Sequence, residues 1–423
     1  MRRAIVLCAL LAPALGRLVA SAAAPQRLEL AAADHDDVVP ETVGTERSTW
    51  RIANRPTAVA AGAASTPLEI PTREIVRWGE CPPWPTGPVV LLIDGGVIAG
   101  RIESAAEQTI VIQSVSLGRL ELPAAAVLGF RESSATGPAM LALRPDGSTP
   151  PRASPSAATV VLTNGDRIAA HTIAWQGDTL AVDAAAGAFT IPTRVVQAFD
   201  IAMPQPADRA ASQQILAALG DGSRFVISDL RSTASENGLP TRIALTLHLK
   251  EQMLAAVCDA EDCVALAVDG GSTRFLGRLE PAVYEQSSKF GPAWPLARGH
   301  SLTGDWPACR GDTGFATLGI HAPARVRYHL EPPADRFESL VAIDDSAGTG
   351  GSVVIRVMAH SGNAAPREVF VSPVIRGSGP PLAILAELQA ATEIELVVES
   401  ADDSDILDRT LWLDPRVITT VGQ

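Results

Sequence analysis

A stretch near the C-terminal end of the chain, residues 318–357, alternates between apolar and polar positions in three separate runs. In the first run Val326, Tyr328 and Leu330 fall on one side of an extended chain, and the charged or polar residues between them fall on the other. A period of two is typical of strands that bury one face. The glycine-rich residues 346–351 support neither a strand nor a helix period, so they predict a turn. The pattern indicates the core of a β-sandwich.

Three earlier segments share one opening pattern, in which an apolar run, an Asp-Gly or Asn-Gly pair and a second apolar run follow one another. They begin at Val89, Thr159 and Ile215, and each predicts a β-hairpin because these residue pairs tolerate positive φ. Closing segments follow the first two, LELPAAAVLGF from Leu120 and FTIPTRVVQAF from Phe189. A similar segment, LEIPTREIVRW, stands alone at residues 68–78. The chain therefore repeats a unit of short strands, which suits a small barrel-like β-module.

These patterns predict a mainly β chain in which small repeated modules precede a C-terminal β-sandwich. Asp94, Asn164 and Asp221 recur at one position of the repeat, and turn geometry explains them without a functional role. No basic stripe or shared aromatic set runs through the copies, which favours spacer or interaction modules over a binding array. The predicted boundaries are 25–88 for a linker-like region with the partial repeat, 89–133 and 155–202 for two repeats, 212–290 for an expanded third repeat ending in a strand pair over 263–279, and 291–423 for the sandwich with its leading segment.

The first 24 residues predict a secretory signal peptide. Arg2 and Arg3 form a basic start, residues 4–16 an apolar core, and Ala20-Ser21-Ala22 a small-residue cleavage site. No other stretch reaches about 18 uninterrupted apolar residues, so no integral membrane helix is expected. We expect the protein to be secreted, periplasmic or part of the cell envelope.

Export would place the remaining cysteines in an oxidising compartment, where an even number favours disulfides. Cys258 and Cys263 flank a polar turn and predict a short-loop disulfide. Cys81 and Cys309 would then form the second pair by default and tie the N-terminal part to the C-terminal domain. A zinc site is the rival interpretation, but only His248 lies near the close pair and a second close pair is lacking.

Composition and motifs exclude several classes of function. The net charge of −13 argues against a nucleic-acid-binding protein, which needs a basic face to meet phosphates. The sequence has no Gly-x-Ser-x-Gly elbow, no His-Glu-x-x-His, no phosphate loop and no dinucleotide fingerprint. A sandwich and small repeats leave no room for a typical catalytic barrel. We therefore expect a non-catalytic protein without an organic cofactor.

Four separated motifs in the last third of the chain carry a family resemblance. They are Gly-Ile-His-Ala at 319–322, Ile-Asp-Asp followed by Gly-Ser-Val-Val at 343–354, Val-Ile-Arg-Gly at 374–377, and Trp-x-Asp-x-Arg at 412–416. In this order they resemble the NPCBM/NEW2 family of carbohydrate-binding modules over residues 314–418. The stretch FGPAWPLARGHSLTG extends the likeness back to Phe290. The resemblance implies a galactose-binding-like β-sandwich of jelly-roll type, with relatives attached to glycoside hydrolases.

The resemblance also marks candidate sugar-binding residues: Gly319, His321, Asp344, Asp345, Arg376, Trp412 and Asp414. An imidazole at His321 could donate to a sugar hydroxyl, or be buried and bonded to a neighbouring strand. The paired carboxylates of Asp344 and Asp345 could accept from vicinal hydroxyls, bind Ca²⁺, or cap the turn that follows. The ring of Trp412 could offer a stacking face to a sugar, or belong to the core.

The chain departs from the family pattern at two places near the expected ligand. Ala316 and Thr317 stand where a basic residue and glycine are common, and residues 406–411 replace an acidic-His run. The resemblance implies a secreted protein that recognises glycans, galactose-containing ones among them. Two alternatives stay open: a cell-envelope structural protein whose module docks a partner protein, and an accessory module of a glycoside hydrolase system.

Overall fold

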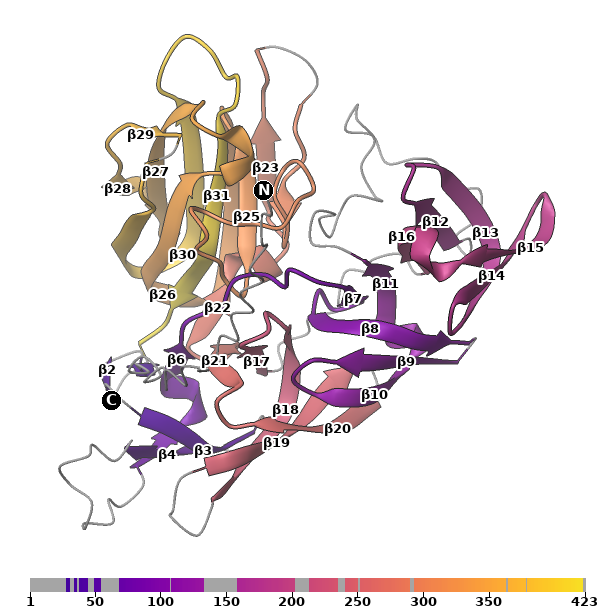
Figure 1. Cartoon of the computed structure of the whole chain (residues 1–423). Helices are drawn as coiled ribbons and strands as arrows, with labels where there is room; N and C mark the ends of the chain where they lie inside the picture. Colours follow the sequence, from indigo (N-terminus) through magenta and orange to yellow (C-terminus); the bar gives the residue numbers. More distant parts are fainter. Residues whose placement is uncertain are drawn as a thin grey trace, which may run out of the picture.

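The computed structural model describes residues 28–30, 34–35, 38–44, 49–54, 68–106, 108–132, 158–201, 213–234, 240–249, 252–289, 293–362, 364–377 and 379–420. These residues form antiparallel strands and short 3-10 turns, with no α-helix among them, which confirms the mainly β prediction. One large sheet precedes residue 270 and a second, C-terminal sheet follows it (Figure 1). No helix in the described part of the chain is long and apolar enough to cross a membrane. The predicted signal peptide lies outside the described residues.

The N-terminal sheet is built from a partial unit and three full units, which together are called the array. The partial unit region holds β1 (Leu28–Leu30), β2 (Asp34–His35), β3 (Val38–Gly44), β4 (Thr49–Asn54), β5 (Leu68–Pro71), η1 (Thr72–Glu74) and β6 (Ile75–Gly79). Unit 1 holds β7 (Val89–Leu92), β8 (Val97–Ala105), β9 (Thr109–Ser114), β10 (Gly118–Pro123), η2 (Ala124–Ala126) and β11 (Val127–Arg131). Unit 2 holds β12 (Ala158–Leu162), β13 (Arg167–Gln176), β14 (Thr179–Ala184), β15 (Gly187–Pro192), η3 (Thr193–Val195) and β16 (Val196–Asp200). Unit 3 holds β17 (Gln214–Leu219), β18 (Arg224–Ala234), β19 (Pro240–Leu249), β20 (Gln252–Asp259) and β21 (Cys263–Asp269).

The three full units share one topology. Four strands form a meander, and the fifth returns to pair with the first, as β11 does with β7, β16 with β12 and β21 with β17. The predicted hairpin turns are present: Gly95, Gly165 and Gly222 all adopt φ near +89°. In the same turns Asp94 and Asp221 accept a hydrogen bond from the backbone N–H two residues on. Turn geometry therefore accounts for the recurring Asp and Asn positions.

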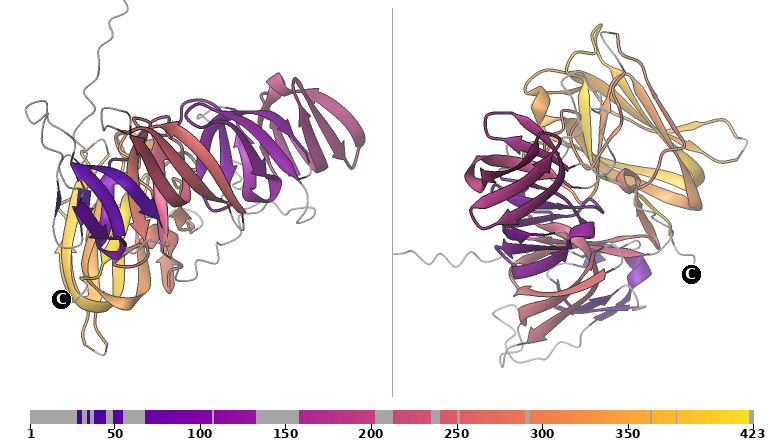
Figure 2. Two further views of the ribbon diagram at one scale, coloured as in Figure 1. Left: turned by 90° about the horizontal axis from the view of Figure 1, so that it is seen from below. Right: turned by 90° about the vertical axis from the view of Figure 1, so that its right-hand side faces the viewer.

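Neighbouring units pair through strands that occupy the same position in each unit. Phe130 of β11 lies opposite Phe199 of β16, and Trp78 of β6 lies opposite Leu266 of β21, so closing strand meets closing strand in both cases. Units 1 and 3 meet through their second strands, where Val97 lies opposite Arg224. The units follow one another as partial unit, unit 3, unit 1 and unit 2, which leaves unit 2 at the far end of the array (Figure 2).

The C-terminal module is a β-sandwich. Its strands are β22 (Thr273–Phe275), β23 (Val283–Gln286), β24 (Ala297–Arg298), β25 (Thr317–His321), β26 (Ala324–Ile343), β27 (Ser352–His360), β28 (Arg367–Val371), β29 (Ile375–Arg376), β30 (Leu382–Ser400) and β31 (Arg409–Ile418), with 3-10 turns η4 (Leu276–Arg278) and η5 (Asp345–Ala347). The first half of β26 pairs with the second half of β30, and that half of β30 also pairs with β27. The second half of β26 pairs with β31. These two long strands thus run through both layers.

The core of the sandwich lies between the layers, where the sequence places it. Val326, Tyr328 and Leu330 are buried, whereas Arg325 and His329 between them are exposed, so the alternation is confirmed. The layers change at Pro332-Pro333 in β26 and at Gln389-Ala390 in β30, where the ladder shifts and both Gln389 and Ala390 have φ of +57°. Proline cannot donate to the ladder, which favours a corner at this point.

The array and the sandwich are joined by strand pairing. The sequence predicts that residues 263–279 form a strand pair within the third repeat. For β22 this prediction is wrong. Apart from one bridge between Gly270 and Thr273, β22 pairs with β31 of the sandwich instead. This pairing buries an apolar side chain, because Phe275 packs in a cluster with Leu216 of the array and Ala316 of the sandwich. The segment that closes the array therefore also belongs to the sandwich.

A buried arginine completes the joint. Arg224 of the array donates to Gly314 O at 2.7 Å and to Thr313 Oγ1 at 2.8 Å, and also to Pro82 O. Its guanidinium lies 3.6 Å from the ring centre of Trp84, whose Nε1 donates to Pro307 O. A charge this deeply buried is stabilised here by acceptors for both terminal nitrogens of the guanidinium and by a ring face. These contacts hold the two modules together at the joint.

The predicted disulfides are absent, since Cys81, Cys258, Cys263 and Cys309 are all free thiols in the structure. Cys81 lies beside the charges of Arg224 and Asp414, whereas Cys309 lies beside Asp344 and Asp345 and its Sγ contacts Leu411 O at 3.6 Å. These two thiols sit in separate environments, which explains why they do not pair. Cys258 and Cys263 are both buried in the array core without a bond, so there the thiols act as small apolar residues.

Candidate functional site

One end of the sandwich is organised around residues 401–409, which connect β30 to β31 and are called the 401–409 loop. Its backbone bonds to both neighbouring strand ends: Asp408 O accepts from Ala322 N at 2.9 Å, and Arg409 O accepts from Asp344 N at 2.8 Å. Asp405 accepts from Lys289 N at 2.6 Å and from Ser288 Oγ at 3.1 Å. The loop thereby draws together the ends of β23, β25 and β26.

His321 ends β25 beside this loop, and an indole ring covers it. The ring of Trp294 lies parallel to the imidazole, with centroids 4.9 Å apart and an interplanar angle of 3°. His321 is only 4% exposed, and its Nδ1 lies 2.7 Å from Ala322 O. Burial lowers the pKa of His321, so the ring is neutral at pH 7 with Nδ1–H as donor. Of the two alternatives for His321, the structure has the buried, backbone-bonded ring.

Trp294 is a residue that sequence reasoning missed. Its ring is partly exposed, and its backbone is fixed because Gln286 Oε1 accepts from Trp294 N at 2.8 Å and Tyr284 OH donates to Trp294 O at 2.8 Å. In the sequence Trp294 lies in the stretch FGPAWPLARGHSLTG, which carries the family likeness, but nothing there marks it as a ligand contact. A half-buried indole stacked on a buried ring is suited to pack its exposed part against an apolar ligand face.

Asp344 and Asp345 cap the turn that starts the glycine-rich loop. Asp344 Oδ1 accepts from Ser346 N at 2.8 Å, while Asp345 Oδ1 accepts from Arg310 N at 2.8 Å. Asp344 is buried, and that burial raises the pKa of its carboxyl despite the bond from Ser346. Both carboxylates therefore hold backbone segments together at the loop end, the turn-capping alternative of the sequence interpretation.

Exposed charges surround the 401–409 loop. Asp402 is held by hydrogen bonds from Ser352 Oγ at 2.7 Å and Ser404 N at 2.9 Å, which lower the pKa of its carboxyl, and the positive charges of Arg376 and Lys289 lower it further. The side chains of Lys289 and Arg376 are exposed. A fixed carboxylate with nearby cationic donors can accept and donate hydrogen bonds to a polar ligand.

The remaining candidates lie elsewhere. Trp412 is fully buried in the sandwich core, with its Nε1 3.2 Å from Thr410 Oγ1, so it offers no face to solvent. Gly319 faces the leading segment, where an added Cβ would meet Ala297 Cβ at 3.0 Å. Asp414 accepts from Ala316 N at 2.9 Å near the joint with the array. The structure therefore brings His321, Asp344, Asp345 and Arg376 to one end, and places Gly319, Trp412 and Asp414 within the fold.

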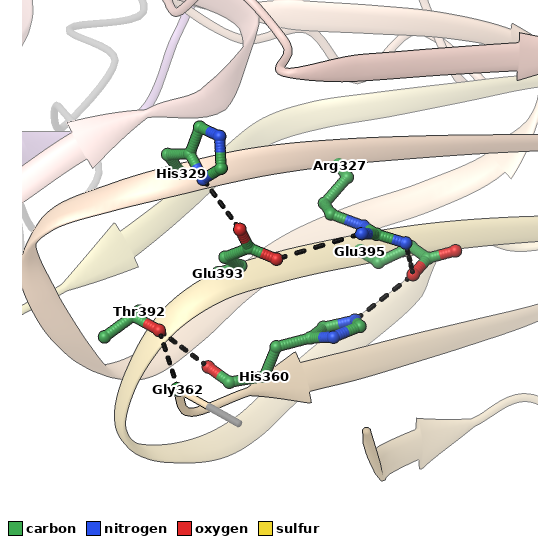
Figure 3. A network of polar contacts seen from close by, with 7 residues as sticks. All are labelled: Arg327, His329, His360, Gly362, Thr392, Glu393 and Glu395. Carbon is green, nitrogen blue, oxygen red and sulfur yellow. Dashed lines mark hydrogen bonds and ion pairs between the residues drawn. The ribbon is translucent and has the colours of Figure 1, made fainter. Parts of the chain in front are cut away.

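The open face of β26, β30 and β27 carries a separate network of charges (Figure 3). Arg327 lies 3.2 Å from Glu395 and 3.9 Å from Glu393, and each carboxylate also meets a histidine, His360 at 3.1 Å and His329 at 2.8 Å. Cross-strand ion pairs of this kind stabilise a sheet modestly. These contacts link three neighbouring strands, so the network stabilises this sheet.

Calcium at Asp344 and Asp345 is not supported by the arrangement. In the part of the chain that the structure describes, no group of three or more His, Cys, Asp or Glu side chains could hold a metal ion. The cap bonds from Ser346, Arg310 and Gly311 engage Asp344 Oδ1 and both oxygens of Asp345, and the one oxygen left, Asp344 Oδ2, is too few for a cation that takes about six to eight oxygen ligands.

Comparison with known proteins agrees with this architecture. Residues 282–418 match the NPCBM/NEW2 domain family, so this part of the chain is an NPCBM/NEW2 domain. The CBM51 module of Clostridium perfringens GH95, solved with methyl-galactose, shares 22% identity; the match covers 34% of this chain and 99% of that module, with a TM-score of 0.29. CBM51-2 and the INT domains of Clostridium perfringens ZmpB, solved with GlcNAc, share 16% identity over 45% of this chain and 40% of theirs, with a TM-score of 0.31. A search of curated protein sequences found no match.

Proposed function

We propose that the chain is an exported, non-catalytic protein that binds carbohydrate at the 401–409 loop end of its NPCBM/NEW2 domain. The observation that supports the proposal is the half-buried indole of Trp294, stacked on His321 and next to a loop lined with exposed charges. Sugar rings present C–H groups that pack on an indole and hydroxyls that need both donors and acceptors. The site offers both kinds of contact.

Each residue has a role in this proposal. Trp294 packs against the apolar face of a sugar ring, and His321 holds the indole in place from behind. Asp402 accepts from ring hydroxyls, while Lys289 and Arg376 donate to them or to an acidic substituent. Ile406, 63% exposed at the tip of the loop, adds an apolar contact in place of the family's acidic-His run.

Galactose-containing glycans are the ligand class that we propose first. The methyl-galactose in the Clostridium perfringens CBM51 structure motivates the choice of ligand to try and does not establish it. A module of this kind would serve either a cell-surface protein or a glycoside hydrolase system, and both uses need the same contact with sugar.

A glycan array probed with the full chain tests the proposal. We expect a restricted set of glycans to be bound, and we expect Trp294→Ala to abolish the signal while Arg325→Ala, a change at an exposed site on β26, retains it. Binding to no glycan at all would refute the proposal, as would equal binding by both variants.

A further inference from the structure

The array joins its units through pairs of equivalent strands. Closing strands meet at the contact between the partial unit and unit 3 and again between units 1 and 2, and second strands pair there as well, β3 with β18 and β8 with β13. Units 3 and 1 meet at the start of their second strands, where Val97 lies opposite Arg224, and this side of a unit is called its meander side. Along the array the contacts therefore alternate as closing, meander and closing. Unit 2 ends the series with its meander side turned outward (Figure 2).

The meander contact of units 1 and 3 shows what this surface does when it is covered. Val97 lies opposite Arg224, Ala99 N donates to Ser223 Oγ at 2.8 Å, and Ser116 N donates to Asp221 Oδ2 at 3.3 Å. On unit 1 the side chains at this junction are almost fully buried, namely Val97, Ala99, Leu117 and Leu120, and Val97 also packs in a cluster with Trp84 and Trp306. Both apolar contacts and hydrogen bonds hold this junction.

The equivalent surface of unit 2 is uncovered. Aligning the Asn164-Gly165 turn with Asp94-Gly95, and FTIP with LELP, makes Arg167, Ala169, Ala186 and Phe189 the equivalents of Val97, Ala99, Leu117 and Leu120. All four are exposed. Phe189 is 39% exposed, whereas its counterpart Leu120 is 4% exposed. Among the described strands β15 pairs with β14 alone, so its outer edge carries backbone groups available for pairing.

We propose that a second copy of this chain covers the meander side of unit 2. The start of β13 and the outer edge of β15 of one copy then lie against the same segments of the other, while the end of β13 stays paired with β8 of its own chain. The occupant follows from the chain's own contacts, because each junction of the array joins like strands of like units. A contact of like with like closes into a dimer about a two-fold axis. Repeat arrays need their terminal faces covered, and residues 184–188, which are alanines and one glycine, let two sheet edges approach closely. The two sandwiches then lie at opposite ends of the dimer.

Sedimentation equilibrium of the full chain, without any glycan present, tests this proposal. We expect a reversible monomer–dimer equilibrium, and we expect Phe189→Glu and Ala169→Glu each to raise the dimer Kd at least tenfold. A two-fold axis places each new carboxylate near its own copy, so like charges repel across the contact. Leu385→Glu is the matched control, since Leu385 is 64% exposed on the sandwich and should leave the Kd unchanged.

Circular dichroism establishes that the variants are folded. If Phe189→Glu does not fold, Ala169→Glu decides, because Ala169 is exposed and does not belong to the array core. A wild-type chain that stays monomeric at every concentration would overturn the proposal, whether or not another protein binds this face. A dimer that survives the decisive variant unchanged would overturn it as well.

Discussion

Trp294 and His321 form a parallel ring pair at the end of the sandwich, with centroids 4.9 Å apart. The family motif marks His321 as a candidate ligand contact, whereas in the structure it supports the indole. His321 is buried and neutral, so it supports the indole, and Trp294 presents the surface that a ligand can reach. His321→Ala should therefore weaken glycan binding less than Trp294→Ala does, measured as dissociation constants by titration on the same glycan. A larger loss from the histidine change would contradict this order.

Trp412 should act on stability and not through ligand contact. Because its side chain is fully buried in the sandwich core, Trp412→Ala is expected to lower the free energy of unfolding by about 3–5 kcal/mol. Denaturant unfolding followed by circular dichroism measures this change. A folded variant that keeps its stability but loses glycan binding would instead place the indole at the ligand.

The buried Arg224 should couple the array to the sandwich. Arg224→Met removes the hydrogen bonds to Gly314 O and Thr313 Oγ1 and one of the two to Pro82 O, which keeps the bond from Thr313 Oγ1. We expect a loss of at least ~2 kcal/mol in unfolding free energy. Calorimetry should then resolve two thermal transitions, one for each module. Arg325→Met, at an exposed position, is the control and should change stability by less than about 0.5 kcal/mol. A single unshifted transition in the Arg224 variant would show that the joint does not depend on this residue.

The four cysteines should behave as unreactive thiols, three of them buried and Cys81 half-buried. Burial raises the pKa of Cys81 and of Cys258 to about 12, and it raises the pKa of Cys263 and Cys309 as well. Since the thiolate is the reactive form, iodoacetamide at pH 8 should leave all four unmodified in the native protein and modify all four in denaturant. Mass spectrometry of the denatured, unreduced chain counts them. Any of these cysteines that resists alkylation until a reductant is added would indicate a disulfide.

Asp344 should destabilise the fold more as the pH rises. Burial raises the pKa of its carboxyl in the folded protein above the pKa in the unfolded chain, which is about 3.9. The stability associated with the neutral carboxyl is therefore complete below the unfolded pKa and is lost as the pH rises through the folded pKa. Asp344→Asn should therefore gain stability relative to wild type between pH 4 and pH 7. Asp402→Asn should show the opposite trend, because the pKa of Asp402 is lowered. Denaturant unfolding at the two pH values measures both, and equal differences at both pH values would contradict the assignment.

Much of the fold could be predicted because its signals are local. The alternation around Tyr328 and the Asp-Gly turns depend on neighbours in the chain, and the structure confirms both. The pairing partner of β22 could not be predicted, since β31 lies far from it along the sequence. The same holds for Cys81 and Cys309, whose surroundings are set by tertiary packing.

The family motifs marked candidate residues but not their exposure. His321 and Asp344 lie at one end of the sandwich in the structure, whereas Trp412, marked in the same way, is buried in the core. Trp294 could not be identified from the sequence, because its importance depends on its stacking on His321. The pairing of like units along the array likewise appears only in three dimensions.

The central claim is that the half-buried indole of Trp294 binds sugar, and isothermal titration calorimetry tests it most directly. The full chain and its Trp294→Ala variant would be titrated with a galactose-terminated glycan identified on the glycan array, after thermal unfolding has shown that both are equally folded. We predict saturable binding by the wild type and a loss of at least tenfold in affinity for the variant, since stacking on an aromatic ring accounts for much of the contact. Equal affinity of the two proteins would contradict the account.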